Sequence, residues 1–345
     1  MTSTKQPRHS AYTPLEFRPA WWLPGPHLQT LGARFLRPRG GIPLRRERWE
    51  TQDGDFLDLD HAFDGTQDSR APLVVVLHGL EGSSRSKYAL QTYRAIHDAG
   101  ARAVGLNFRG CSGELNRLPR SYHSGETEDL AFVLERLRER TDVPMGLIGF
   151  SLGGNILLKF LGERGEAARD LVAAASVISV PYDLAAGALF LQRPGGWIYR
   201  SFLLRKLRRK IKAKRALLPK TLEIDRIARA RSFHAFDDAA TAPLHGFAGA
   251  DDYYARSSSR SFLESIRVPT MLIHALDDPF VPGHAVPHDE VRRNPYLVSR
   301  FSRDGGHVGF VSGAAPWRLS FWAEKEAARF VTSIVGPDGD DRTVR

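Results

Sequence analysis

The chain has 345 residues, 42% of them hydrophobic and 26% charged, and these values are ordinary for a folded globular protein. This length favours a single core with an insertion and a terminal extension over two full domains. The 49 lysines and arginines outnumber the 39 acidic residues, but no nucleic-acid-binding motif accompanies this excess. We therefore expect no nucleic-acid partner.

The sequence lacks the features that are typical of secreted and membrane-spanning proteins. Cys111 is the single cysteine, which excludes an intramolecular disulfide and the usual structural zinc sites. The sequence has no run of about eighteen apolar residues, and its basic start has no apolar stretch of the kind found in secretory signals. These features predict a cytoplasmic protein that does not span a membrane.

Residues 1–65 are predicted to form an N-terminal arm followed by a hairpin. The arm is rich in proline and in aromatic residues such as Trp21 and Trp22, which predicts an extended segment held down by its aromatic rings. The hairpin turns at Asp53-Gly54, a dipeptide typical of tight turns between antiparallel strands.

Strands and helices alternate through residues 66–180, the predicted first half of the core. The apolar runs typical of buried parallel strands are residues 73–77, 101–108, 145–150 and 172–180. The helical patterns between them cover residues 86–99, 126–138 and 152–162. Ser124 is a candidate N-cap for the helix at 126–138. This alternation predicts an α/β fold whose mostly parallel, doubly wound sheet has helices on both faces.

The alternation stops at residue 181. Residues 181–250 have an irregular helical pattern and predict a helical cap inserted into the core, with a basic stretch at residues 200–215. Strand patterns return at residues 270–275 and 296–301. The second half of the core is predicted at residues 251–335, and its last helix at residues 316–335. Residues 336–345 are predicted to form a disordered acidic tail.

Gly149-Phe150-Ser151-Leu152-Gly153 fits the pattern G-x-S-x-G and lies between a predicted strand and a predicted helix. Glycines two positions before and after the serine allow a sharp turn that would exclude larger side chains. The turn places the serine at a helix N-terminus, where backbone N–H groups favour developing negative charge. This setting predicts that Ser151 is a nucleophile.

A nucleophilic serine needs a base to accept its proton. His307 lies in the glycine-rich loop that follows the predicted strand at residues 296–301, where this kind of sheet presents such a base. His274 lies inside a predicted strand, so we expect it to be a buried residue with satisfied hydrogen bonds. His307 is therefore the predicted base.

The base in turn needs an acid to orient it, and two adjacent carboxylates compete for that place. Asp277 and Asp278 both follow the predicted strand at residues 270–275. Pro279 favours an extended backbone at Asp278, which projects that side chain away from the strand end. We therefore expect Asp278 to orient His307, and Asp277 to have a turn or capping role.

Two backbone N–H groups are predicted to hold the oxyanion that forms when an ester carbonyl is attacked. One belongs to Leu152, the residue after the nucleophile. The other is predicted at Leu80, because the loop after the first core strand begins His78-Gly79 and brings backbone close to the substrate. We expect His78 to fix this loop by hydrogen bonding rather than to act as a base.

These motifs together resemble the YheT-like group of α/β hydrolases, which is related to eukaryotic α/β-hydrolase-domain lipases and yeast medium-chain ethyl-ester synthases and esterases. The resemblance covers most of the chain and implies the α/β-hydrolase fold. It also implies a Ser-Asp-His triad at Ser151, Asp278 and His307 and activity on carboxylic esters or acylglycerols. The segments that carry it are residues 19–23, 27–30, 78–82, 107–113, 122–127, 149–154, 275–279 and 305–310.

We therefore expect a serine esterase that acts on short- to medium-chain acyl esters or acylglycerols and needs no cofactor or metal. An acyltransferase would use the same residues with an alcohol in place of water. A serine peptidase is less favoured, because its cap should hold a substrate amine with acidic residues and this cap is basic. Residues 200–215 predict either a solvated face or contact with an anionic membrane surface. Tyr253 and Tyr254 are predicted either to line the acyl pocket or only to pack against neighbouring residues. The oligomeric state does not follow from the sequence.

Overall fold

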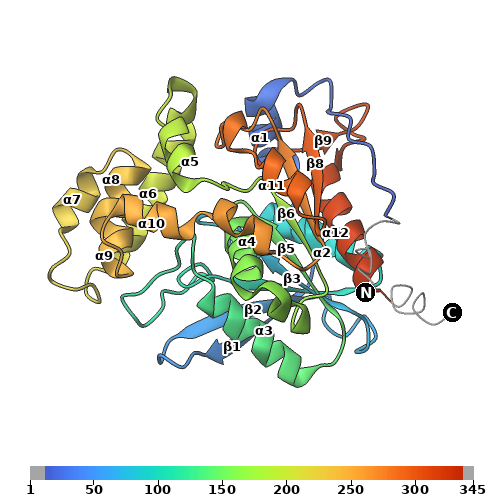
Figure 1. The fold of residues 1–345 in the computed structure, drawn as a ribbon, viewed down its shortest axis with the longest axis horizontal. Coiled ribbons are helices and arrows are strands. Elements are labelled where there is room, and N and C mark those ends of the chain that lie inside the picture. The colour runs from blue at the N-terminus through green and yellow to red at the C-terminus, as the bar shows by residue number, and fades with distance from the viewer. Residues whose placement is uncertain (1–11, 337–345) are drawn as a thin grey trace.

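A computed structural model describes residues 12–336, so the predicted tail lies outside the described residues except for Gly336. The centre of the molecule is an eight-stranded sheet in the order β1-β2-β4-β3-β5-β6-β7-β8 (Figure 1). Its strands are β1 (Leu44–Glu50), β2 (Phe56–Ala62), β3 (Leu73–Leu77), β4 (Arg102–Asn107), β5 (Met145–Phe150), β6 (Ala174–Ile178), β7 (Thr270–Ala275) and β8 (Leu297–Ser302).

The six strands from β3 to β8 pair in parallel, and the β1–β2 hairpin adds to β4 in the antiparallel sense. Every residue of β3, β5, β6 and β7 is buried, as expected for strands covered on both faces. The predicted fold class is therefore confirmed: a mostly parallel, doubly wound sheet with a helical insertion.

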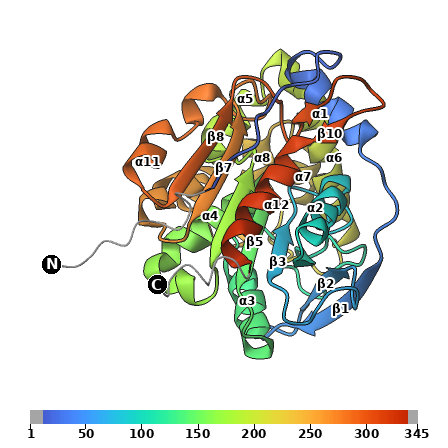
Figure 2. The same ribbon diagram turned by 90° about the vertical axis from the view of Figure 1, so that its right-hand side faces the viewer.

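Helices cover both faces of this sheet. Helices α2 (Lys87–Asp98) and α12 (Trp322–Val335) lie side by side on one face, in front of the central strands in Figure 2. Helices α3 (Glu128–Arg140) and α4 (Leu152–Arg164) pack on the opposite face. The short helix α11 (His288–Arg293) precedes β8. Because the strands from β3 to β8 are parallel, their carboxyl ends lie at one edge of the sheet, and the candidate site lies at that edge.

Two helix starts differ from their predicted positions. Helix α3 begins at Glu128, so Ser124 is not its N-cap; instead, the Ser124 carbonyl accepts from the Asn155 amide and its N–H donates to the Tyr253 hydroxyl. Helix α12 begins at Trp322 because the preceding residues pair as a small two-stranded sheet. The strands of that sheet are β9 (Val311–Ser312) and β10 (Ser320–Phe321).

The N-terminal arm contains a helix that its composition did not predict. Helix α1 (Gly25–Leu36) has a proline in its first turn, where the fixed proline backbone fits and no N–H is needed. The aromatic residues of the arm also behave differently from one another. Phe17 packs on Phe310 and Trp322 in the core, whereas Trp21 is 76% exposed. The prediction of a wholly extended arm is therefore wrong.

The helical cap lies together to one side of the sheet, at the left in Figure 1, and has its own apolar cluster. The cap is built from one helix of 17 residues, Trp197–Ala213, and several shorter ones. These are α5 (Leu184–Phe190), α6 (Trp197–Ala213), α7 (Ile224–Arg229), α8 (Phe233–Phe236), α9 (Ala242–Leu244), α10 (Ala250–Ser257) and the π-helical turn η4 (Asp237–Thr241).

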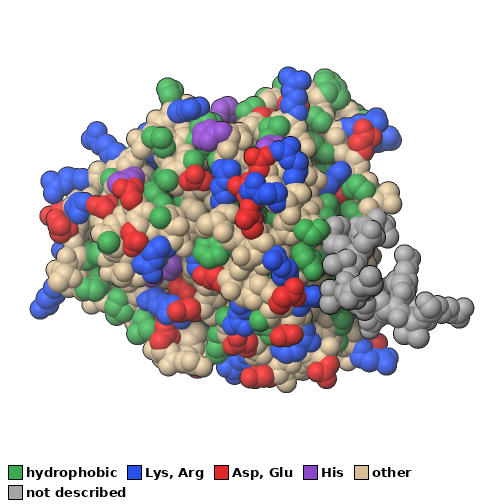
Figure 3. All heavy atoms as spheres, in the orientation of Figure 1, with side chains coloured by type: hydrophobic (Ala, Val, Ile, Leu, Met, Phe, Trp, Pro, Cys, Tyr) green, Lys and Arg blue, Asp and Glu red, His purple; other side chains and the backbone are tan. Residues whose placement is uncertain are grey.

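Basic and acidic side chains are interspersed over the face shown in Figure 3, so the formal net charge of +10 does not gather there into one basic field. Within residues 12–336, no helix is both long enough and apolar enough to cross a bilayer.

Candidate active site

Ser151 lies at the sharp turn between β5 and α4, as the sequence pattern predicts. Its backbone has φ 51° and ψ −118°, a region that non-glycine residues rarely occupy. This strained turn is typical of a nucleophile elbow, because it lifts the serine hydroxyl off the strand end. The hydroxyl therefore stands at the carboxyl edge of the sheet, next to the first turn of α4.

The glycines that flank this turn are required by close backbone contacts. A Cβ atom on Gly149 would lie 2.7 Å from the Cα atom of Gly154. A Cβ atom on Gly153 would lie 2.5 Å from the carbonyl oxygen of His78. Carbon atoms cannot approach this closely, so larger side chains at these two positions would force the elbow to open.

The loops after β7 and β8 bring two more predicted residues to the serine. Nε2 of His307 lies 3.0 Å from Oγ of Ser151, and Nδ1 of His307 lies 2.8 Å from Oδ2 of Asp278. Asp278 is 2% exposed, and its Oδ1 accepts from the Phe280 N–H. The ring of Phe280 stacks on the His307 ring, with 4.0 Å between ring centres. The structure thus places all three predicted side chains in one hydrogen-bonded chain.

Asp277 points elsewhere, although it precedes Asp278 directly. Its Oδ1 accepts a hydrogen bond from the Gly306 N–H at 2.8 Å, in the loop that carries His307. Burial raises the pKa of this carboxyl above its ordinary value. Asp277 therefore ties the two loops together, a different role from the turn or capping role expected for it.

Helix α1 holds the His307 loop from the other side, and sequence reasoning gave its residues no role in the site. The Thr30 hydroxyl accepts from the His307 N–H at 2.9 Å. The Gln29 amide bonds both the N–H and the carbonyl of Val311. Arg37, paired with the buried Glu324, donates to two carbonyls of the same loop. The signal for this contact was the family resemblance, which includes residues 27–30 but assigned them no role.

The loop after β3 is fixed by two tyrosines. The Gly79 N–H donates to the Tyr88 hydroxyl at 2.9 Å, and the Glu81 N–H donates to the Tyr122 hydroxyl at 2.7 Å. Between them, the Leu80 N–H donates no hydrogen bond to any residue from 12 to 336. The Leu152 N–H is the first of helix α4 and has no acceptor within that helix. Both predicted donors are thus free to bind a ligand oxygen.

His78 fixes this loop, as expected. Its Nδ1 lies 2.8 Å from the Gly79 carbonyl, and its Nε2 accepts from the Phe108 N–H. Burial lowers the pKa of His78 to about 3, so the ring stays neutral and donates to the Gly79 carbonyl.

Three lysines of the basic stretch face the core rather than solvent. Nζ of Lys206 donates to the Glu81 carbonyl at 3.0 Å, and Nζ of Lys210 lies 2.6 Å from the Glu81 carboxylate. Lys214 is buried and donates to the Arg120 carbonyl, and its burial lowers its pKa to about 8. The interpretation of this stretch as wholly solvated or membrane-facing is therefore wrong for these residues. Lys206 and Lys210 attach α6 to the loop beside Ser151, and Lys214 attaches the end of that helix to Arg120.

One cavity of about 140 Å³ connects this edge of the core with the cap. Ser151, His307, Leu80 and Leu152 line it from the core. Most of its cap residues are apolar or aromatic, namely Leu184, Gly187, Ala188, Leu191, Leu203, Leu207, Phe233, Phe236, Tyr253 and Tyr254. A cavity of about 150 Å³ holds one benzene molecule, so this space accommodates an apolar group of about six carbon atoms. Tyr253 and Tyr254 therefore line the pocket as well as pack.

Comparison with known families decides the class of this protein. Residues 72–314 match the family described as the alpha/beta hydrolase fold, and that range holds all three residues of the hydrogen-bonded chain. The chain belongs to the α/β-hydrolase family. It is thereby an enzyme of the hydrolase class.

Individual relatives agree with this assignment. The chain is 38% identical over 324 residues to YheT of Escherichia coli, which is named as an esterase, covering 93% of this hydrolase and 94% of that protein. It is 31% identical over 327 residues to phospholipase ABHD3 of Mus musculus, covering 92% and 79% of the two chains. The solved esterase Pf2001 of Pyrococcus furiosus shares the fold at 18% identity, with a TM-score of 0.51 over 79% of this chain and 90% of the other. The predicted resemblance to the YheT-like group is confirmed.

The cavity of this hydrolase is also lined by a carboxylate that was not predicted from the sequence, because the cap is basic as a whole. Asp237, in the π-helical turn η4, lines the same cavity as Ser151 and His307. The prediction against a peptidase took the basic composition of the cap to mean that no acidic side chain of the cap lines the cavity. That assumption is wrong, because net charge does not report which side chains point inward.

His274 differs from its prediction in one respect. It is fully buried in β7 as expected, but neither ring nitrogen has a hydrogen-bond partner among residues 12–336. Burial lowers its pKa to about 4, so the ring is neutral at pH 7. The expectation of satisfied hydrogen bonds is therefore wrong.

One group of three side chains in the described part of the hydrolase has the spacing of metal ligands: His123, Glu126 and His245. Their hydrogen bonds do not suit a metal. The Gly125 N–H donates to Nδ1 of His123, so the neutral ring carries its proton on Nε2 and offers no free lone pair. Arg120 already donates to Glu126 at 2.8 Å.

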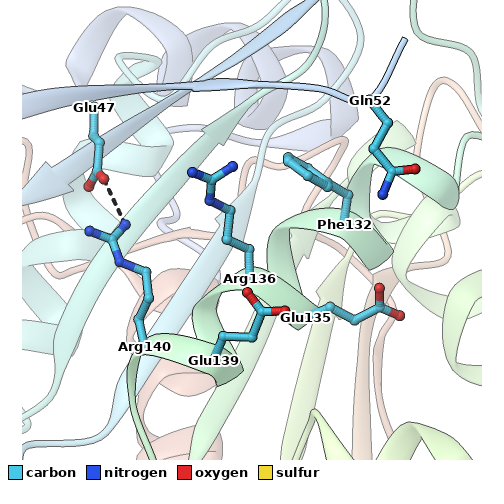
Figure 4. Close-up of a pocket in the computed structure, with 7 residues that line it drawn as sticks. All are labelled: Glu47, Gln52, Phe132, Glu135, Arg136, Glu139 and Arg140. Atoms are coloured by element: carbon cyan, nitrogen blue, oxygen red, sulfur yellow. Dashed lines mark hydrogen bonds and ion pairs between the residues drawn. The ribbon is translucent and has the colours of Figure 1, made fainter.

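A second depression of about 680 Å³ lies between β1 and α3 (Figure 4). It is lined mainly by charged side chains, and Glu47 and Arg140 form an ion pair across it. Arg136 stacks on the rings of Trp49 and Phe132 and so belongs to the packing of that wall. None of the residues around Ser151 lines this depression. The cavity beneath the cap, which Ser151 and His307 line, is the candidate site.

Proposed function

We propose that this chain is a serine carboxylic-ester hydrolase acting on short- to medium-chain acyl esters or acylglycerols. The observation that carries the proposal is the hydrogen-bonded chain from Ser151 through His307 to Asp278 at the floor of an apolar cavity. The cavity volume of about 140 Å³ supports a short or medium acyl group. The esterase and phospholipase names of the relatives support an ester as the substrate.

In the proposed reaction, Oγ of Ser151 attacks the ester carbonyl while Nε2 of His307 takes the hydroxyl proton. The free N–H groups of Leu80 and Leu152 then hold the oxyanion. His307 passes the proton to the departing alcohol, and Asp278 stabilises the imidazolium ion meanwhile. Water, activated by the same imidazole, releases the acyl group from Ser151. The scheme needs neither metal nor cofactor.

A fluorophosphonate probe tests the nucleophile directly. The purified protein should become labelled at Ser151, and Ser151→Ala should neither label nor hydrolyse p-nitrophenyl butyrate. The expected loss in kcat is about 10⁴-fold or more, because members of such a triad act as a unit. Peptide mapping that finds the label on another serine would contradict the proposal. Added ethanol or glycerol would reveal acyl transfer as a new ester product.

We propose further that the outer face of α1 and α6 contacts an anionic membrane surface. Apolar side chains are exposed along it, including Trp197 at 56% and Phe35 at 72%. The Arg34 guanidinium lies 4.7 Å from the Phe202 ring centre, which joins the two helices into one face. Arg205 and Arg209 are exposed on α6 as well. Exposed apolar and basic side chains together favour an anionic lipid surface over water.

Vesicle sedimentation tests this contact. Vesicles that contain phosphatidylserine should retain the protein, and vesicles of phosphatidylcholine alone should retain it less. The double variant Trp197→Ser/Phe202→Ser should lose binding to both kinds while keeping its activity on a water-soluble ester. If vesicles retained the variant and the unaltered protein equally, this face would not contact the membrane and would be an ordinary solvated surface.

A further inference from the structure

Asp237 occupies an unusual position in the wall of the cavity beneath the cap. It begins the π-helical turn η4, in which the wider spacing of backbone hydrogen bonds changes the direction of side chains compared with an α-helix. Single turns of this kind are found frequently at functional sites. Here the turn brings a carboxylate into a cavity whose other cap residues are mostly apolar or aromatic.

The charge of this carboxylate has no counter-charge in the described part of the chain. Oδ1 accepts from the Thr241 hydroxyl at 2.6 Å and Oδ2 accepts from the Tyr254 hydroxyl at 2.8 Å, and no lysine, arginine or histidine pairs with it among residues 12–336. Burial raises the pKa of Asp237 to about 6, so the group is still mainly ionised at pH 7. Its two oxygens have further lone pairs to offer.

The neighbouring residue shows what an ordinary surface carboxylate does in the same turn. Asp238 pairs with the Arg226 guanidinium and accepts from the Ala250 N–H. Asp237 therefore lacks a cation although one stands within reach of the adjacent position. A half-buried carboxylate without a cation is costly, and a positively charged ligand would relieve that cost.

The rings around Asp237 also suit a cation. Phe233, Phe236, Tyr253 and Tyr254 are all buried and line the same cavity. The faces of such rings attract ammonium groups, and the attraction strengthens where water is excluded. A carboxylate among aromatic rings is the arrangement that recognises quaternary or protonated amines.

We infer that the cap part of this cavity binds a cationic ammonium group carried by the ester substrate, with Asp237 as the residue that selects it. This inference rests on the proposed esterase function and narrows its substrate class. The ester carbonyl would lie at Ser151 while the ammonium group lies among the rings beside Asp237. Either the alcohol or the acyl part of the ester can carry the charge.

Ester pairs that differ only in charge test the inference. Acetylcholine carries a trimethylammonium group on its alcohol, and 3,3-dimethylbutyl acetate has carbon in place of that nitrogen. For a charge on the acyl part, the pair is p-nitrophenyl 4-(trimethylammonio)butanoate and p-nitrophenyl 5,5-dimethylhexanoate. We expect kcat/KM for the cationic ester to exceed that for its neutral partner by about tenfold or more in at least one pair.

Substitution then assigns the preference to one side chain. Asp237→Asn keeps the shape of the side chain and removes its charge, so the ratio of the two kcat/KM values should fall toward one. Asp238→Asn is the matched control and should leave the ratio unchanged, because its carboxylate pairs with Arg226. With the unaltered protein, tetramethylammonium ion should inhibit hydrolysis of the neutral ester more strongly than tert-butanol does.

The possible failures are distinguishable. If the unaltered protein hydrolyses both members of each pair equally well, the inference is overturned and the esterase proposal stands. A charge preference that survives Asp237→Asn also overturns it. If none of the four esters is hydrolysed in a Ser151-dependent manner, the proposed function fails, and this inference fails with it.

Discussion

The sheet core and the helical cap both line the cavity at Ser151, but different interactions hold their side chains in place. In the core, Ser151 is placed by a strained turn between two elements, and the loop of His307 follows a strand end and is held by side chains of α1. In the cap, side chains provide the attachment: Lys206 and Lys210 reach across to Glu81, and the Tyr253 hydroxyl accepts from the Ser124 N–H. The core thus carries the reacting side chains, and the cap supplies most of the apolar lining of the cavity.

The largest expected effect concerns the core alone. Asp278→Asn keeps the shape of the side chain but favours the wrong tautomer of His307, so kcat should fall by up to about 10⁴-fold with little change in melting temperature. Asp277→Asn, the matched control, removes only a carboxylate acceptor for the Gly306 N–H and should remain largely active. Steady-state kinetics with p-nitrophenyl butyrate measures both. If Asp277→Asn were inactive and Asp278→Asn active, Asp277 would be the residue that orients His307.

The next effect concerns the attachment of the cap. The ion pair between Lys210 and Glu81 is largely buried, with side chains 13% and 8% exposed. Lys210→Met leaves the Glu81 carboxylate without this partner, which should lower the free energy of unfolding by about 3 kcal/mol. Lys212→Met, on the exposed side of the same helix, should change it by less than about 0.5 kcal/mol. Urea unfolding that shows equal effects would mean that α6 is not held through this pair.

A smaller effect should appear on acidification, at the junction of cap and core. The rings of His123 and His245 lie 4.5 Å apart, and burial lowers their pKa values to about 2 and about 4. The unfolded chain binds these protons near pH 6.5, so it takes them up before the folded chain does as the pH falls. Stability is therefore little affected above pH 6.5 and decreases below it, toward pH 4 for His245 and toward pH 2 for His123. For His245 alone, the decrease is on the order of 2 kcal/mol at pH 5.

Chemical unfolding at pH 7 and pH 5 measures this contribution. His245→Phe keeps an aromatic ring beside His123 and should reduce the loss of stability between the two pH values. His234→Phe is the matched control, since His234 is half exposed and its removal should change that loss little. An unchanged pH dependence in His245→Phe would show that the junction opens before these rings titrate.

The core was predictable from the sequence because its signals are local. An apolar run followed by a glycine-flanked serine fixes a strand, a turn and a helix within a few residues, and Pro279 separates Asp278 from Asp277 by its effect on the adjacent backbone. The sequence placed Ser151 and His307 at the same sheet edge, since parallel strands end together. The distances between them agree with that placement.

The rest depends on partners that are distant in the sequence. Lys206 and Lys210 lie four residues apart on one side of α6, but Glu81 lies 125 residues before Lys206, and no local pattern joins them. Helix α1 was missed because proline and aromatic residues suggested an extended chain. Asp237 was missed because the net charge of the cap was used in place of the direction of one side chain.

The smallest expected effect uses the outward side of the same cap helix. Arg205 and Arg209 are exposed on α6, each one residue before an inward lysine. Near an anionic bilayer a basic residue contributes about 1 kcal/mol, so Arg205→Gln or Arg209→Gln should each weaken binding to phosphatidylserine vesicles by about fivefold at most. The effect should diminish as salt shortens the range of the attraction.

Neither arginine substitution should alter the urea midpoint or the activity on a soluble ester, because neither side chain contacts Glu81. Lys206→Gln is the informative partner: it removes the donor to the Glu81 carbonyl, so it should affect stability rather than vesicle binding. If Lys206→Gln weakened vesicle binding as much as Arg205→Gln, the inward and outward sides of α6 would not be separate in solution. The proposal that inward lysines attach α6 to the core while outward arginines contact the membrane would then be wrong.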